Sequence, residues 1–128
     1  MKILLDTHAL LWMLSDDERL SDQAKNYILN HNNELFFSLA SYWEICIKQS
    51  LGKLQLEGNW QKNIDQEMLY NCIRWLNIET SHCVKIIDLP FIHRDPFDRL
   101  LVAQAICNKM RILTKDEQIA QYEIKTIW

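Results

Sequence analysis

Four acidic residues fall where strands of a predicted sheet end or where the following helices begin. They are Asp6, Glu44, Asp98 and Asp116. Two ionised carboxylates about 4 Å apart repel each other by roughly 4 kcal/mol at an effective dielectric constant near 20, so a cluster of four needs cations to neutralise it. Oxygen ligands without Cys or His suit Mg²⁺ or Mn²⁺. If these acids meet, the sequence predicts a divalent-metal site, and phosphate chemistry is its expected use.

Each of these acids could also have a purely structural role. In "HRDPFDRLLVAQA" (His93–Ala105), Asp95 is the predicted N-cap of a helix, Pro96 its first residue, and Asp98 an acid in its first turn. Asp6 would occupy a strand-end turn, Glu44 would form a capping box with Ser41, and Asp116 would be an N-cap. Local roles do not account for the expected convergence of the acids, so both interpretations stay open at this point.

The elements that would position the acids alternate along the chain. The predicted strands are Lys2–Leu5, Glu34–Phe37, Cys72–Ile78, Arg111–Thr114 and an edge strand, Glu123–Trp128. The predicted helices are His8–Leu14, Ser21–Asn30, Ser41–Gly52, Trp60–Leu69, Ser81–Asp88 with Thr80 as its cap, a helix from Pro96 onward, and Glu117–Tyr122. This alternation predicts an α/β fold with a mostly parallel sheet and helices on both faces. Ligands bind at the carboxyl edge of such sheets, where the acids would lie.

Composition restricts the class of protein. The chain has 128 residues, of which 48% are apolar and 24% charged, so we expect one globular domain over residues 1–128. A net charge of −3 argues against a broad phosphate-binding surface, although a short RNA at a metal-charged cleft remains compatible with it. No segment is long and apolar enough to predict a membrane span. Asp6 and His8 interrupt the apolar start, so we expect no signal peptide and a cytoplasmic location.

The cysteines do not indicate a metal or disulfide framework. Cys46, Cys72, Cys83 and Cys107 are irregularly spaced and form no C-x-x-C pair. We therefore expect them to be reduced and mostly buried, as small apolar residues.

Four segments in order resemble the PIN-domain ribonucleases, and particularly the VapC-type toxins of bacterial toxin–antitoxin pairs. They are "LLDTHALLW", "SLASYWEICIKQSLGKLQL", "HRDPFDRLLVAQA" and "ILTKDEQIAQY". The likeness spans nearly the whole chain, with matching separations and total length. The family's four acids fall on Asp6, Glu44, Asp98 and Asp116, whereas Asp95 lies beside the third position and is kept as a helix cap and possible supporting acid.

The resemblance implies a three-layer α/β/α sandwich and a Mg²⁺- or Mn²⁺-dependent endoribonuclease. It also implies a homodimer that is neutralised by a cognate antitoxin protein and acts on an RNA substrate. Asp6 and Asp98 would be the principal metal ligands, with Glu44 and Asp116 as further ligands. Thr7 and Thr114 would support ligands, water or phosphate, although hydroxyls at strand ends commonly bond to backbone instead. His8 is expected to be a buried, hydrogen-bonded structural residue.

Other classes of function compete with this interpretation. A free-standing PIN nuclease without an antitoxin has the same residues. A receiver domain would need an adjacent acidic pair after the first strand, where this chain has a single acid, Asp6. A haloacid-type phosphatase would need D-x-D at the same place, but position 8 is His. A non-catalytic metal-binding or protein-interaction module would use the tryptophans as anchors, namely Trp12, Trp43, Trp60, Trp75 and Trp128. Metal titration and RNA cleavage distinguish these alternatives.

Overall fold

The computed structural model describes residues 1–128 and contains one five-stranded sheet. The strands are β1 (Lys2–Leu5), β2 (Glu34–Ser38), β3 (Ile73–Leu76), β4 (Arg111–Leu113) and β5 (Thr126–Ile127). Their order in the sheet is β3-β2-β1-β4-β5, and every neighbouring pair is parallel. The predicted parallel sheet is therefore confirmed, with β5 as the predicted edge strand.

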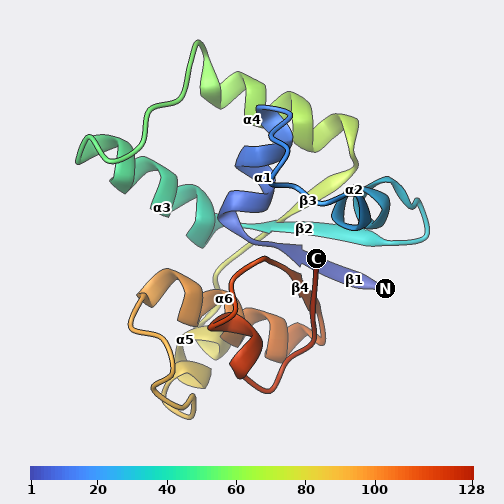
Figure 1. Ribbon diagram of the computed structural model, residues 1–128. Coiled ribbons are helices and arrows are strands. Elements are labelled where there is room, and N and C mark those ends of the chain that lie inside the picture. The colour runs from blue at the N-terminus through green and yellow to red at the C-terminus, as the bar shows by residue number, and fades with distance from the viewer.

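Helices cover both faces of this sheet. They are α1 (Thr7–Leu14), α2 (Asp22–Leu29), α3 (Leu39–Ser50), α4 (Trp60–Tyr70), α5 (Thr80–Ile86) and α6 (Pro96–Asn108). Figure 1 shows α1 to α4 on one side of the sheet and α5 and α6 on the other. No helix is long and apolar enough to span a lipid bilayer.

The central strand β1 supplies side chains to both layers of the core. Ile3 and Leu5 pack with the cluster under α1 to α4, whereas Leu4 packs with the cluster under α6, and all three side chains are fully buried. Alternating side chains of a strand point to opposite faces, so an uninterrupted apolar run fits a strand that is covered on both sides. The three-layer α/β/α sandwich is confirmed.

Strand register explains why the predicted site residues gather at one edge of the sheet. Leu5, the last residue of β1, pairs with Phe37 of β2 and with Leu113 of β4. The carboxyl ends of the three central strands therefore lie side by side. The segments that leave these ends carry Asp6, the start of α3 and Asp116.

Helix α3 begins earlier than its sequence pattern predicted. Ser38, at the end of β2, is the N-cap, and its hydroxyl accepts a hydrogen bond from the Ala40 backbone N–H at 3.0 Å. Ser41 lies inside the helix, fully buried, with no hydrogen-bond partner for its Oγ. The predicted capping box of Ser41 and Glu44 is therefore wrong, and the Glu44 side chain is available for other contacts.

Three smaller predictions are also corrected. Thr80 is the first residue of α5 rather than its cap, because Glu79 precedes it as N-cap and donates its backbone N–H to His82 Nδ1 at 3.0 Å. The predicted helix Glu117–Tyr122 is a short 3₁₀ turn, Ile119–Gln121. The cysteines were expected inside, but all four are exposed free thiols.

Candidate active site

The four predicted acids line one cavity of about 400 Å³ at the carboxyl edge of the sheet. Asp6 joins β1 to α1, Glu44 projects from α3, Asp98 lies in the first turn of α6, and Asp116 follows β4. Asp95 also lines this cavity, together with the basic residues Arg19, Lys48 and Lys115. The geometry therefore brings the acids together, and their role as metal ligands stays a prediction.

Asp6 is fixed through both of its carboxylate oxygens. Oδ1 accepts the backbone N–H of Ala9 at 2.7 Å, which makes Asp6 the N-cap of α1, and Oδ2 accepts the Thr114 hydroxyl at 2.5 Å. Asp6 is only 7% exposed. Burial raises the pKa of Asp6, and the hydrogen bonds from Thr114 and Ala9 oppose that rise. Thr114 therefore holds the Asp6 carboxylate in place through this hydrogen bond, and its predicted support of a metal ligand stays a prediction.

Glu44 is held between a hydroxyl and an ammonium group. Thr7 donates its hydroxyl to Glu44 Oε1 at 2.6 Å, and Lys48 Nζ lies 2.9 Å from Oε2. Glu44 is 3% exposed, so its charge is removed from water and paired with Lys48, one helical turn away. Burial lowers the pKa of Lys48, but Glu44, Asp95 and Asp98 outweigh that effect, so the pKa is raised and the ammonium is retained.

The two aspartates at the start of α6 differ in their environment. Asp95 is the predicted N-cap, since its Oδ1 accepts the backbone N–H groups of Phe97 at 2.8 Å and Asp98 at 3.3 Å. The pKa of Asp98 is raised to about 7, first by burial and then by the negative charges of Asp95 and Glu44. A carboxyl group whose pKa is raised by burial and by neighbouring acids marks a candidate functional site.

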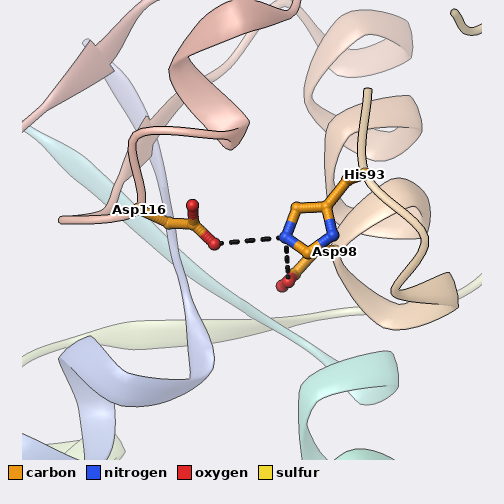
Figure 2. Close-up of side chains that lie close together, drawn as sticks. All are labelled: His93, Asp98 and Asp116. Carbon is orange, nitrogen blue, oxygen red and sulfur yellow. Dashed lines mark hydrogen bonds and ion pairs between the residues drawn. The ribbon is translucent and has the colours of Figure 1, made fainter. Parts of the chain in front are cut away.

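Sequence reasoning missed His93, which lies between two of the acids. Figure 2 shows its ring pointing toward Asp98 and Asp116, with Nε2 at 3.0 Å from Asp98 Oδ2 and 3.3 Å from Asp116 Oδ2. His93 stands five positions before Asp98 in a polar turn, where the sequence indicates only a loop. Asp116 is 23 residues away, so the contact follows from the tertiary fold and no local pattern signals it.

His8 does not have the environment expected from its motif. It is exposed, lines the cavity and makes no hydrogen bond; its ring lies 5.6 Å from that of Trp12. The prediction of a buried, hydrogen-bonded histidine is therefore wrong. Position 8 is the second residue of α1, and it points outward because Thr7 and Ala9 on either side are buried.

The chemistry of the cavity fits a hard divalent cation. Carboxylate oxygens dominate the possible ligands, which is the set that Mg²⁺ and Mn²⁺ prefer. Ligand atoms of His93, Asp98 and Asp116 all lie within 4.8 Å of one another, close enough to surround one ion. Burial raises the pKa of Asp98, and the negative charges of Asp95, Glu44 and Asp116 raise it further, so a bound cation would relieve repulsion at this carboxyl group.

Comparisons with known proteins agree with this geometry. Over 98% of both chains, the sequence is 27% identical to "Ribonuclease VapC22" of Mycobacterium tuberculosis (strain ATCC 25618 / H37Rv). The fold is similar to VapBC2 from Rickettsia felis, solved bound to a DNA fragment from its promoter, with a TM-score of 0.76, 14% identity and coverage of 99% and 98% of the two chains. It is also similar to VapBC-1 from nontypeable Haemophilus influenzae, with a TM-score of 0.63, 17% identity and coverage of 99% and 97%. The family model described as PIN domain matches residues 3–125, and the chain therefore belongs to the PIN domain family.

Proposed function

We propose that this chain is a Mg²⁺- or Mn²⁺-dependent endoribonuclease and the toxin of a type II toxin–antitoxin pair. The observation that carries the proposal is the meeting of Asp6, Glu44, Asp98 and Asp116 in one cavity of a PIN domain. The full-length similarity to a protein named a ribonuclease supports RNA as the substrate class. Hydrolysis of an RNA phosphodiester bond is the reaction that this set of acids would serve.

Asp6 and Asp98 would hold the metal as principal ligands, with Glu44 and Asp116 completing the oxygen set. When bound, the ion would supply Lewis-acid chemistry, neutralising charge on the scissile phosphate and making water a better nucleophile. The chain's own contribution is orientation. Thr114 fixes Asp6 Oδ2, and the backbone of α1 fixes Asp6 Oδ1, so this carboxylate cannot rotate.

Basic residues at the cavity would bind the RNA backbone beside the acids. Lys115 lines the cavity and carries a charge that attracts phosphate groups, whereas Lys48 also lines it but is paired with Glu44 at 2.9 Å. Arg19 is already engaged, because its Nη2 lies 2.7 Å from Asp17 Oδ2, so it offers less charge to a ligand. With a net charge of −3, the whole chain would hold RNA through a few local contacts rather than a broad basic surface.

An antitoxin partner is supported by the two similar structures, which are of VapBC proteins. A segment of the antitoxin would cover the cavity, and a basic side chain from it would approach the acids in place of a cation. Trp43 and Trp75, which are 57% and 40% exposed, are available as apolar anchors for the antitoxin or for a second copy of the chain. The cytoplasm, where RNA and an antitoxin meet, would be the site of action.

Cleavage of purified RNA tests the proposal. The wild-type chain should cleave in Mg²⁺ or Mn²⁺ and stop in EDTA. Asp6→Asn should abolish cleavage with little loss of stability, because asparagine still caps α1 and removal of a buried negative charge offsets the weakened bond to Thr114. The matched control is Asp22→Asn, which changes an exposed first-turn acid of α2 and should leave cleavage unchanged.

The alternative functions give different results in the same assay. Metal binding without cleavage of any RNA would favour a non-catalytic module. Cleavage without growth inhibition on expression, and without a neighbouring small gene whose product binds the chain, would favour a free-standing PIN nuclease.

A further inference from the structure

His93 lies where a cation shared by Asp98 and Asp116 would lie. Its Nε2 is 3.0 Å from one carboxylate and 3.3 Å from the other, so a single ring nitrogen bridges acids from α6 and from the turn after β4 (Figure 2). The ligand atoms of the three residues fall within 4.8 Å of one another. A divalent ion bound to the two carboxylates would therefore need the space that this nitrogen now fills.

The other ring nitrogen fixes where the proton of His93 is. Nδ1 faces the backbone N–H of Asp95 at 3.2 Å, and because that group is a donor, Nδ1 must accept. A ring proton then lies on Nε2, which donates to Asp116 Oδ2 at 3.3 Å and lies 3.0 Å from Asp98 Oδ2. A histidine that ligates a metal through Nε2 has the opposite tautomer, with its Nδ1–H donated to an acceptor. In this orientation His93 is a hydrogen-bond donor to Asp116 and not a further ligand.

The fold holds this donor firmly in place. The backbone N–H of His93 donates to the Tyr122 hydroxyl at 2.9 Å, and Tyr122 is itself 4% exposed. The His93 side chain is 13% exposed. Lys48 makes a useful contrast, because its side chain is 37% exposed on a flexible stem and can leave Glu44 without disturbing the backbone. His93 therefore has fewer ways to move aside than Lys48 has.

We propose that His93 is a built-in substitute for the cation, whose contacts with Asp98 and Asp116 must break before a divalent metal can bind that pair. This inference rests on the metal site of the proposed function. A group that stabilises only the metal-free state lowers metal affinity, since affinity measures the difference between the two states. His93 thus sets the metal concentration at which the site fills. A residue that merely positioned the ligands would raise the metal affinity instead.

Mn²⁺ binding tests the sign of this effect directly. The free ion is measured by electron paramagnetic resonance during titration of wild-type, His93→Phe, His93→Ala and His93→Gln proteins. About pH 8 is suitable because it lies above the raised pKa of Asp98, about 7, so proton competition is small. We expect Phe and Ala, which lack the donor, to bind Mn²⁺ about tenfold more tightly, the change that loss of one hydrogen bond to a charged group produces. Gln can still donate and should remain near wild type.

Two further measurements complete the design. In EDTA, His93→Phe should melt at a lower temperature than wild type, because the repulsion between Asp98 and Asp116 is no longer bridged. The control His31→Ala removes an exposed ring from the turn before β2, outside the cavity, and it should leave Mn²⁺ affinity unchanged. Circular dichroism identifies any variant that fails to fold. Because Phe and Ala both remove the donor, either variant that folds can test the inference.

The possible outcomes separate this inference from the proposed function. If Phe and Ala bind Mn²⁺ more weakly than wild type, His93 is a ligand or a positioning residue and the inference is wrong. Equal affinities would also overturn it. If wild type binds no Mn²⁺ and cleaves no RNA, the proposed function fails and this inference fails with it. Normal Mn²⁺ binding by wild type together with weaker binding by both variants leaves the proposed function intact.

Discussion

Replacing Asp98 with Asn should stabilise the metal-free protein while abolishing RNA cleavage. The pKa of Asp98 is raised to about 7 because the carboxyl group is buried and because Asp95, Glu44 and Asp116 add negative charge around it. Ionising this group therefore costs the folded state free energy. An amide of nearly the same shape removes that cost together with the charge that would hold the metal.

The sign of the pH dependence follows from the direction of this pKa shift. The folded-state pKa lies above the ordinary value of 3.8, so the contribution of Asp98 to stability is fully present below about pH 4. It is lost as the pH rises through about 7. The difference between a pKa of 3.8 and one of about 7 corresponds to roughly 4 kcal/mol in the free energy of unfolding, taken as an upper bound.

We expect the measured gain to be smaller than this bound. The Asp98 side chain is 19% exposed, so water screens part of the repulsion, and Asn must still fill a polar site. A gain of about 1–2 kcal/mol at about pH 8 would raise the melting temperature by about 3–10 °C in a chain of this size. At about pH 5, where Asp98 is protonated in the folded chain but largely ionised in the unfolded one, the gain should be less than half as large, and it should vanish only below about pH 4.

Thermal unfolding in EDTA at the two pH values measures this effect, and addition of Mg²⁺ should then stabilise wild type but not Asp98→Asn. The control is Asp95→Asn, which keeps the N-cap bonds to Phe97 and Asp98 and should change stability little, because Asn is as good a cap. An Asp98→Asn protein that is less stable at about pH 8 would refute the reasoning from burial and charge. An Asp98→Asn protein that still cleaves RNA would refute the site assignment.

Three other outcomes are expected. Glu44→Gln should keep a hydrogen bond from Thr7 but lose its charge, so RNA cleavage should fall strongly while the melting temperature changes little; a large loss of stability with normal cleavage would make Glu44 purely structural. Thr114→Val should leave Asp6 Oδ2 buried without its donor, costing about 1–3 kcal/mol in a chemical denaturation experiment, and an unchanged midpoint would contradict that. Sedimentation equilibrium should detect a homodimer in the micromolar range, and a monomer throughout that range would count against it.

Much of the fold could be predicted because parallel sheets obey a simple geometric rule. An apolar run such as Lys2–Leu5, followed at once by a polar residue, indicates a buried strand and marks its carboxyl end. Since these ends share one edge, Asp6 and Asp116 could be assigned to the same region although they are far apart in sequence. The cap at Asp95 was predictable because aspartate before proline has a local cause for its position.

Other features depended on information that a local pattern does not contain. Ser41 and Glu44 match a capping box, but Ser38 caps α3 because β2 ends there, and a Ser-x-x-Glu pattern does not tell where the preceding strand stops. The exposed cysteines depart from the average behaviour of their residue type. His93 could not be assigned to the site because its second carboxylate partner, Asp116, comes from a distant segment.

The structural and functional roles of the acids are compatible because a carboxylate has two oxygens. Asp6 uses Oδ1 to accept the Ala9 N–H and turns Oδ2 toward Thr114, and Asp116 uses Oδ1 to accept the Gln118 N–H and turns Oδ2 toward His93. A backbone N–H that captures one oxygen fixes the direction of the other, so the turn that ends each strand would also orient a metal ligand of the proposed site. Aspartate-to-asparagine replacement therefore separates the two roles, since the amide oxygen can still satisfy the backbone while the negative charge is lost.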